Sequence, residues 1–320
     1  MTETTKTIFE KYQVRKTNKQ KKAFREYLSS VAEKDGYVCH TEKGYLGARN
    51  LVVGDVKNAK VIYTAHYDTC PRLFFPNFIT PKNFLIYLLY QLLIVAFFLI
   101  IYYSLFFFST AVLMHLAFDP YGIIYTLVTL IPLAVLWLLI FLLLAGPANK
   151  HTANDNTSGV TTLIDTMLSL PEEYRDKTAF VFFDLEEVGL FGSAGFASKH
   201  KTELKDKLVV NFDCVSDGEN ILIVLNKRSK RFEREIKEAF IGKDGISVEV
   251  LSRGVFYPSD QMNFPHGVGV AALKRSKTFK ILYMDKIHTS KDTVYREENI
   301  EFLVHGSAEL LRILCEDKSA

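Results

Sequence analysis

Two adjacent carboxylates at the end of an apolar run are the residues of this sequence best placed to do chemistry. Glu186 and Glu187 follow the run Ala179-Phe-Val-Phe-Phe, which is typical of a strand buried on both faces of a parallel sheet. Open α/β sheets carry their chemistry at the carboxyl ends of such strands. Adjacent side chains on an extended chain point in different directions, so one Glu could bind a metal ion while the other acts as a general base. A charged strand-to-helix turn without chemistry is the alternative.

Four further stretches carry the side chains that divalent metal ions prefer. They are His66-x-Asp68, Asn154-Asp155-Asn156, Asp213 and His288. Imidazole and carboxylate donors suit zinc, with cobalt and manganese as alternatives. Two ions about 3.5–4 Å apart need a carboxylate that bridges them. Asp155, which stands among polar residues before a predicted helix, is a reasonable bridge.

Predicted strands and helices alternate along the polar part of the chain. Apolar runs predict strands at 37–40, 50–53, 60–65, 179–183, 208–212, 221–225, 248–251, 268–273 and 279–284. Helical periodicity predicts helices at 18–33, 158–170, 193–200, 231–241 and 301–315, whereas residues 1–17 lack clear periodicity. This alternation predicts an α/β fold, a three-layer α/β/α sandwich with a mixed, largely parallel central sheet.

Two long apolar runs interrupt that pattern. Residues 84–108 and 122–145 are each long enough to cross a hydrocarbon core of about 30 Å. Between residues 84 and 146 there is no Lys, Arg or Glu, and Asp119 is the only acid. A buried hairpin of a soluble protein is the alternative, but runs of this length favour a membrane. We therefore expect a two-helix transmembrane hairpin, residues 83–146, that contacts the lipid bilayer and is inserted into a domain formed by 1–82 and 147–320.

Charge and cysteine content narrow the possible partners and the compartment. The net charge of the 320-residue chain is only +3, and no basic stripe interleaved with aromatic residues suggests nucleic acid. The four widely spaced cysteines indicate free thiols in a reducing compartment. Cys70 and Cys214 lie beside candidate site residues and are interpreted as packing thiols. The polar N-terminal segment lacks the apolar core of a signal peptide.

The motifs together resemble those of the two-zinc aminopeptidase family, which also includes glutamate carboxypeptidases and glutaminyl cyclases. The resemblance covers roughly residues 20–82 and 147–316, with the motifs in the family's order. It rests on His66-Tyr-Asp68, Asn154-Asp155-Asn156-x-Ser158-Gly159, Asp184-x-Glu186-Glu187-x-Gly189-x-x-Gly192-Ser193, Asn211-x-Asp213 and His288-Thr289-x-x-Asp292. The stretch Tyr257-Pro-Ser259-Asp260-Gln261 looks like a further motif of the family.

The resemblance implies two divalent metal ions, zinc in relatives, and a role for each matched residue. The implied metal ligands are His66, Asp155, Glu187, Asp213 and His288. Asp155 would bridge the ions, with His66 and Asp213 on one ion and the other two ligands on the second. Glu186 would be the catalytic general base, and Asp68 would stand behind His66 and fix its tautomer.

Two positions depart from the family. Gln261 stands where the family often has His, and Ile287 stands where some aminopeptidases have Tyr. The implied function is a membrane-anchored, zinc-dependent exopeptidase that acts on peptide substrates, most simply an aminopeptidase. A glutaminyl-cyclase-like acyltransferase is one alternative, since the cyclases of this family work with a single zinc. A catalytically silent membrane scaffold is another.

The position of the apolar insert constrains the topology. It lies between His66 and Asp155, which would share one metal ion, so the insert must cross the bilayer an even number of times. The flanks carry Arg72, Lys82 and Lys150, whereas the loop between the two runs has no Lys or Arg. By the positive-inside rule, we expect a two-pass integral membrane protein with a cytoplasmic catalytic domain.

Overall fold

A computed structural model describes residues 1–115 and 122–316. Asp119, the acid between the apolar runs, lies outside the described residues. The chain divides into two compact units. The first combines Met1–Lys82 with Ala148–Ala320, and the second is Asn83–Pro147.

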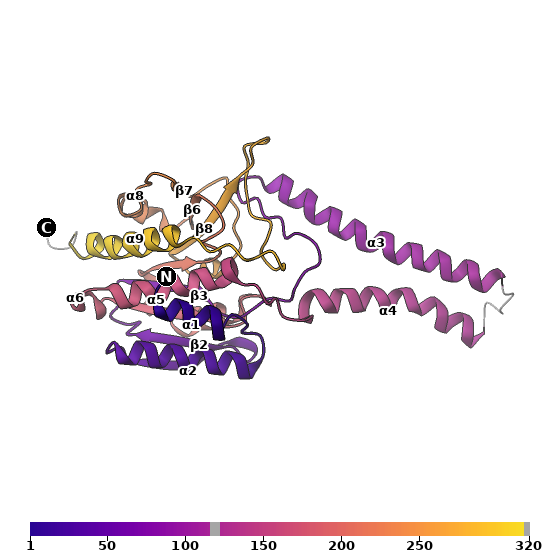
Figure 1. The fold of residues 1–320 in the computed structure, drawn as a ribbon, viewed down its shortest axis with the longest axis horizontal. Helices are drawn as coiled ribbons and strands as arrows, with labels where there is room; N and C mark the ends of the chain where they lie inside the picture. The colour runs from indigo at the N-terminus through magenta and orange to yellow at the C-terminus, as the bar shows by residue number, and fades with distance from the viewer. Residues whose placement is uncertain (116–121, 317–320) are drawn as a thin grey trace. The chain divides into compact units, whose positions relative to one another are not determined.

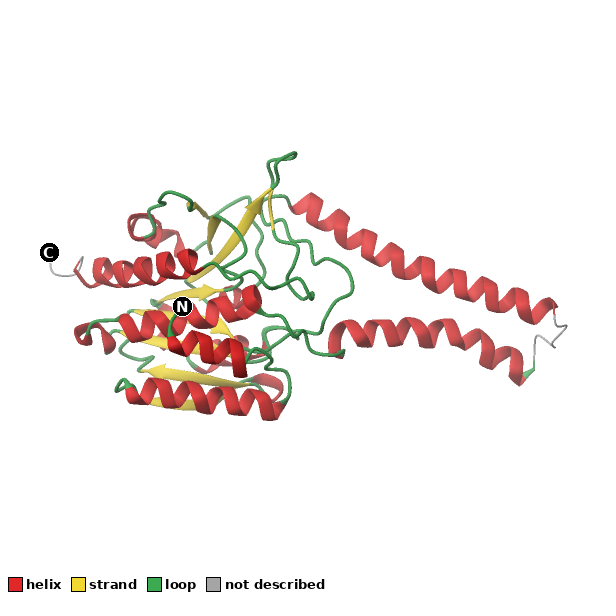
Figure 2. Ribbon diagram, in the orientation of Figure 1, coloured by secondary structure: helices red, strands yellow, loops and turns green. Residues whose placement is uncertain are grey.

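One mixed sheet organises the first unit (Figure 2). In the described part of the chain its strands are β1 (Cys39–Lys43), β2 (Arg49–Gly54), β3 (Val61–His66), β4 (Thr178–Phe183), β5 (Leu208–Phe212), β6 (Asn220–Leu225), β7 (Ser247–Leu251), β8 (Gly267–Arg275) and β9 (Leu282–Tyr283). Their spatial order is β1-β2-β4-β3-β5-β8-β6-β7, and β9 pairs with β8. The central run β4-β3-β5-β8 is parallel. β1 pairs antiparallel with β2, β2 with β4, and β6 with β8, whereas β7 is parallel to β6.

Helices cover both faces of this sheet because its strands are apolar on both sides. Tyr63 and Phe180 point to one face and pack with α1 (Glu3–Lys11), α2 (Asn18–Lys34), α5 (Gly159–Ser169) and α9 (Glu297–Glu316). Their neighbours Ile62 and Val181 point to the other face, where Phe196 of α7 (Phe191–Lys199) covers them. Figure 1 shows α5 and α9 side by side in front of the strands. The predicted three-layer α/β/α sandwich with its mixed sheet is confirmed.

Several predicted elements differ from the observed ones in extent. The last predicted strand, 279–284, shrinks to the two residues of β9, and Phe279 is 77% exposed. The helix predicted at 231–241 is a 3-10 turn, Ser229–Phe232, followed by the short α8 (Glu233–Ala239). A further short helix, α6 (Glu172–Arg175), lies between α5 and β4. Apolar content alone does not show where a strand loses its pairing partner.

The second unit is a hairpin of two apolar helices. They are α3 (Phe84–His115) and α4 (Ile123–Ala145), which pack against each other. Both are long and apolar enough to cross a membrane, and only 6% of the most apolar window of each is buried. A core helix of a soluble protein would bury most of its apolar side chains. Most of the apolar side chains of this hairpin are therefore exposed.

Candidate metal centre

Three parallel strands end at the same edge of the sheet and bring most of the predicted site residues together. His66 is the last residue of β3 and pairs in register with Phe183, the last residue of β4. Glu186 and Glu187 follow the end of β4 by three and four residues, so they lie close to His66. Asp213 follows directly after β5, the other neighbour of β3. The order of the strands thus explains how residues distant in sequence meet.

Asp155 and His288 reach this edge from loops. Asp155 lies in the irregular turn Ala153–Ser158 that precedes α5, and the peptide bond that follows it is cis. His288 has a φ of 61°, in the left-handed region that residues other than glycine seldom adopt. Leu185 and Cys214, which adjoin the glutamates and Asp213, also have positive φ. Positive φ at such residues is typical of functional sites.

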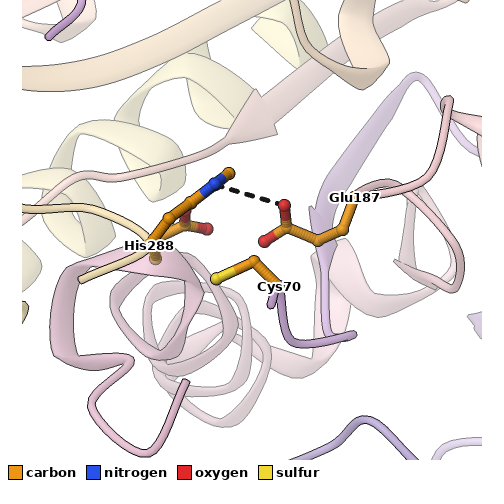
Figure 3. Close-up of side chains that lie close together, drawn as sticks. Cys70, Glu187 and His288 are labelled. Carbon is orange, nitrogen blue, oxygen red and sulfur yellow. Dashed lines mark ion pairs between the residues drawn. The ribbon is translucent and has the colours of Figure 1, made fainter. Parts of the chain in front are cut away.

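The carboxylate of Asp155 stands between two imidazoles. Its Oδ1 lies 3.2 Å from Nε2 of His66, and its Oδ2 lies 2.9 Å from Nε2 of His288. Nε2 of His66 is also 3.5 Å from Oδ1 of Asp213, and Nε2 of His288 is 3.2 Å from Oε2 of Glu187 (Figure 3). Asp155 therefore joins two groups of donors. The structure brings all five predicted ligands together.

These separations are near those of donors that share one metal ion. Two donors about 2.0–2.2 Å from a tetrahedral zinc ion lie roughly 3.3–3.6 Å apart. Of the four distances, one (3.5 Å) falls in that range and the other three (2.9–3.2 Å) are slightly shorter. In addition, Oε1 of Glu187 is buried without a hydrogen-bond partner. Buried polar atoms normally have partners, so the residues present fit a bound cation.

The charges of this pocket also favour a cation. Burial alone would lower the pKa of His288, but the carboxylates of Glu187 and Asp155 raise it to about 9. Burial raises the pKa of Glu187 to about 8, with a further contribution from Asp155. Carboxylates gathered away from water repel one another, and a divalent ion would relieve that repulsion.

A small cavity of about 230 Å³ opens over the site. Its polar wall contains Glu186, the predicted general base, beside the ligand groups. Burial holds the pKa of Glu186 well above its usual range, and the neighbouring carboxylates add to this shift. Its apolar wall is formed by Ile79, Tyr257 and Ile287. Ile287, where some family members have Tyr, therefore adds hydrocarbon and no donor to this wall.

Asp68 contacts more than the histidine it was expected to orient. Nδ1 of His66 lies 3.5 Å from Oδ1 of Asp68, which is long for a hydrogen bond. The two oxygens of Asp68 instead accept hydrogen bonds from the backbone N–H groups of Glu186, at 3.1 Å, and Glu187, at 3.3 Å. Asp68 thus fixes the backbone of the two glutamates.

Two polar residues hold the turn that carries Asp155. Asp292, buried and outside the predicted set of site residues, accepts hydrogen bonds from the backbone N–H groups of Asn154, at 2.7 Å, and Asp155, at 2.9 Å. The amide of Asn156 donates to the carbonyl of His66 and accepts from the backbone N–H of Cys214. These contacts join three of the loops that form the site. The His288-Thr-x-x-Asp292 motif was the only sequence signal for Asp292.

The roles of two residues near the site were not predicted, because contacts with residues distant in the sequence place them there. Arg15, in the segment without clear periodicity, is fully buried, and its Nε donates to the carbonyl of Tyr67. Cys70 was interpreted as a packing thiol, but its sulfur lies within 4.8 Å of ligand atoms of Asp155, Glu187 and His288. Gln261, where the family often has His, lies off the cavity wall, and its side-chain amide donates to the carbonyl of Tyr257.

A comparison with protein families matches residues 141–308 to peptidase family M28. The chain belongs to peptidase family M28. The match spans the region that contains four of the five predicted ligands, and the resemblance to the two-zinc aminopeptidases is confirmed at the level of the family. Membership of M28 supports a hydrolase that acts on peptides. A comparison with curated proteins finds no match.

Solved structures similar to this M28 chain share its fold at low identity. The Tannerella forsythia glutaminyl cyclase gives a TM-score of 0.58 at 13% identity, covering 96% of this chain and 97% of that one. A Zn-dependent exopeptidase from Parabacteroides distasonis gives 0.54 at 15%, covering 97% of both chains. The Legionella pneumophila aminopeptidase LapA gives 0.54 at 12%, covering 96% of this chain and 69% of that one. Aminopeptidases and cyclases are therefore both similar to this fold.

Proposed function

We propose that this M28 chain is a membrane-anchored exopeptidase that uses two zinc ions, and that it acts as an aminopeptidase. The observation that carries the proposal is the shared carboxylate of Asp155, with one oxygen toward His66 and the other toward His288. Each oxygen faces a separate group of donors. Two groups that share a carboxylate are the arrangement that a pair of neighbouring ions requires. Similarity to a Zn-dependent exopeptidase supports zinc as the metal.

We assign the five predicted ligands to two ions that share Asp155. His66 and Asp213 would hold one ion, and Glu187 and His288 would hold the other. When bound, such ions supply Lewis acidity: they polarise the scissile carbonyl and lower the pKa of a water molecule. Asp68 would act as a positioning residue, since it holds the backbone of both glutamates.

Glu186 is the residue we assign to proton transfer. It faces the cavity beside the ligands without belonging to either of the two groups built on Asp155. Burial raises its pKa, and a carboxylate with a raised pKa is a better base near neutral pH. In peptide hydrolysis, Glu186 would accept a proton from the attacking water and deliver it to the amine that leaves.

The size and lining of the cavity favour removal of single terminal residues. Pockets for drug-sized ligands measure about 300–1,000 Å³, and this cavity of about 230 Å³ is smaller. It can admit one side chain but not a folded peptide. Ile79, Tyr257 and Ile287 would contact that side chain, so we expect apolar N-terminal residues to be preferred.

A Glu186→Gln variant tests the enzymatic proposal. It keeps the size of the side chain and removes the basic oxygen, so kcat toward aminoacyl substrates should fall about 10²- to 10⁴-fold. Metal content should stay at the wild-type value. Glu173→Gln, an exchange at an exposed position, is the matched control and should leave kcat unchanged. A Glu186→Gln protein with wild-type kcat would contradict the assignment, and a wild-type protein that hydrolyses no peptide would favour a silent scaffold.

A glutaminyl-cyclase-like acyltransferase is the second candidate, because cyclases are among the similar structures. Metal stoichiometry separates the two. Two ions per chain with release of free amino acid would support the peptidase. One ion per chain with formation of pyroglutamate from N-terminal Gln would support the cyclase.

We further propose that α3 and α4 cross the bilayer as a pair and that the first unit, Met1–Lys82 with Ala148–Ala320, is a cytoplasmic peptidase unit. The support is the length and apolar composition of the two helices. Arg72, Lys82 and Lys150 at the ends of the insert favour the cytoplasmic side. Protease treatment of sealed vesicles tests this orientation: the peptidase unit should be cleaved in inside-out vesicles and protected in right-side-out vesicles. The reverse pattern would contradict it.

A further inference from the structure

The two groups of donors that share Asp155 are not equivalent. One consists of His66, Asp155 and Asp213. The other contains Asp155, Glu187 and His288, together with the sulfur of Cys70, and its four ligand atoms lie within 4.8 Å of one another. Figure 3 shows the Cys70 thiol and the Glu187 carboxylate side by side, close to His288. Only the second group therefore contains a thiol.

The position of Cys70 is fixed by the backbone around it. Its carbonyl accepts a hydrogen bond from the N–H of Asn149 at 3.0 Å, and Leu73 donates to the carbonyl of His288 at 2.7 Å. Cys70 itself is 0% exposed. The sulfur is thus held beside the ligands in a place that solvent does not reach.

The donors around this sulfur are short of partners. Oε1 of Glu187 is buried without a hydrogen bond, and the Glu187 side chain is only 5% exposed. In the part of the chain that the structure describes, no hydrogen bond of the Cys70 thiol is found. Cys214 provides a contrast, because its thiol donates to Oδ1 of Asp213 at 3.1 Å. The unpartnered carboxylate oxygen beside the buried sulfur is an environment that a bound cation would complete.

Resting on the two-metal site proposed above, we propose that Cys70 is a fourth ligand of the ion held by Asp155, Glu187 and His288. Four protein ligands, one of them a thiolate, make a closed tetrahedral zinc site, the type that serves structural roles. The His66, Asp155 and Asp213 group has three protein ligands and keeps a position open, as catalytic zinc sites do. The ion beside Cys70 would therefore be held more tightly and would order the site. The other ion would be the one that binds water and substrate.

A thiolate ligand also gives the Cys70 site a metal preference. Sulfur ligands favour zinc and other soft cations over manganese and magnesium. The open site, which has only nitrogen and oxygen donors, lacks this preference. Controlled chelation should therefore remove one ion first and leave a protein that still holds one ion near Cys70.

X-ray absorption at the zinc edge tests this on the full-length protein in detergent micelles. In protein that retains one ion per chain, we expect one sulfur neighbour per zinc at about 2.3 Å. In protein with two ions, the average should be half a sulfur per zinc. A zinc environment of nitrogen and oxygen alone would overturn the inference while leaving the proposed peptidase intact. A protein that binds no zinc would overturn both.

Two single variants identify the sulfur. Cys70→Ser should abolish the sulfur signal and lower the affinity of the tighter site by about tenfold or more, since even outer contacts of metal ligands contribute 10- to 100-fold. Cys214→Ser should retain the sulfur signal. If Cys214→Ser loses the signal and Cys70→Ser keeps it, the sulfur belongs to the other site and the proposal is refuted. Thermal unfolding of both variants without metal establishes that they fold. If Cys70→Ser does not fold, the wild-type spectrum alone still decides.

Discussion

Removal of the Asp68 carboxylate should weaken the placement of the turn that carries Glu186 and Glu187, as well as that of the His66 side chain. Asp68 is 4% exposed, and each of its oxygens accepts a backbone N–H, one from Glu186 and one from Glu187. In Asp68→Ala both N–H groups lose a charged acceptor in a place that water hardly reaches. In Asp68→Asn one oxygen remains, but the amide nitrogen that replaces the other cannot accept a hydrogen bond.

The size of the effect follows from these two bonds. A hydrogen bond to a charged group contributes about 1.5–3 kcal/mol. Both bonds are rather long, 3.1 and 3.3 Å, so the lower end applies. The free energy of unfolding of the peptidase unit should therefore fall by about 3 kcal/mol in Asp68→Ala and by about half of that in Asp68→Asn. Since the unit would have about 5–15 kcal/mol in total, both variants should still fold.

Denaturant unfolding and zinc titration of the detergent-solubilised protein measure both consequences. Zinc affinity should fall about 10- to 100-fold in Asp68→Ala, because the residue holds Glu187 and contacts His66. Asp55→Ala is the matched control, since exposed Asp55 also accepts a backbone N–H, from Lys57 at 2.7 Å. Water can replace that bond, so the loss should stay below about 1 kcal/mol. If Asp68→Ala were as stable as Asp55→Ala, the two long hydrogen bonds would have no structural role.

Three further results are expected. Lys21→Met should destabilise the fold by about 3 kcal/mol, because it removes the cationic partner of the buried Asp184 carboxylate at 2.7 Å and leaves only the backbone N–H groups of Arg49 and Leu185 as donors; adding Asp184→Asn should recover part of the loss in chemical unfolding. Burial raises the pKa of Asp165 to about 6, so its native carboxyl binds protons more tightly than the unfolded one, and the resulting stability is lost as the pH rises from about 4 to 6. Asp165→Asn should therefore raise the free energy of unfolding by at most about 2 kcal/mol at pH 7 and change it little at pH 4. Chelation should lower the thermal midpoint and zinc should restore it, by about 2.7 kcal/mol at a free concentration 100 times the Kd; a midpoint indifferent to zinc would speak against any metal site.

The centre of the fold was predictable because its strands carry their own signal. Residues 208–212 were predicted as a strand and form β5 with the same bounds. Strands buried on both faces of a parallel sheet are continuous apolar runs, and a sequence shows such runs directly. The strand predicted at 279–284 also looked apolar, but Phe279 is exposed and only two residues pair. The difference is the presence of a partner strand, which no local pattern contains.

The site was predictable to the extent that its residues end strands. His66 ends one strand, and Glu187 and Asp213 follow the two strands that are its parallel neighbours, so their convergence is a consequence of strand order. Cys70 lies four residues beyond His66 in a loop, and this loop is held by the hydrogen bonds of Asn149 to the Cys70 carbonyl and of Leu73 to the His288 carbonyl. The burial of Arg15 likewise could not be predicted from its polar segment, since it depends on carbonyl acceptors such as that of Tyr67. Loop residues are placed by distant partners, and spacing along the chain does not encode them.

The chain can carry a long insert between two residues of one site because the flanks of the insert are tied within the peptidase unit. On the first flank, Ile79 exchanges two backbone hydrogen bonds with Met284, at 2.9 and 3.0 Å. On the second, Asn149 donates to the carbonyl of Cys70, and Pro71 forms a bridge with Ala148. The chain thus leaves and re-enters through segments that the sheet and its loops already hold. The positions of His66 and Asp155 are therefore set by contacts within the unit that contains them, and the α3–α4 hairpin need not determine the distance between these two residues.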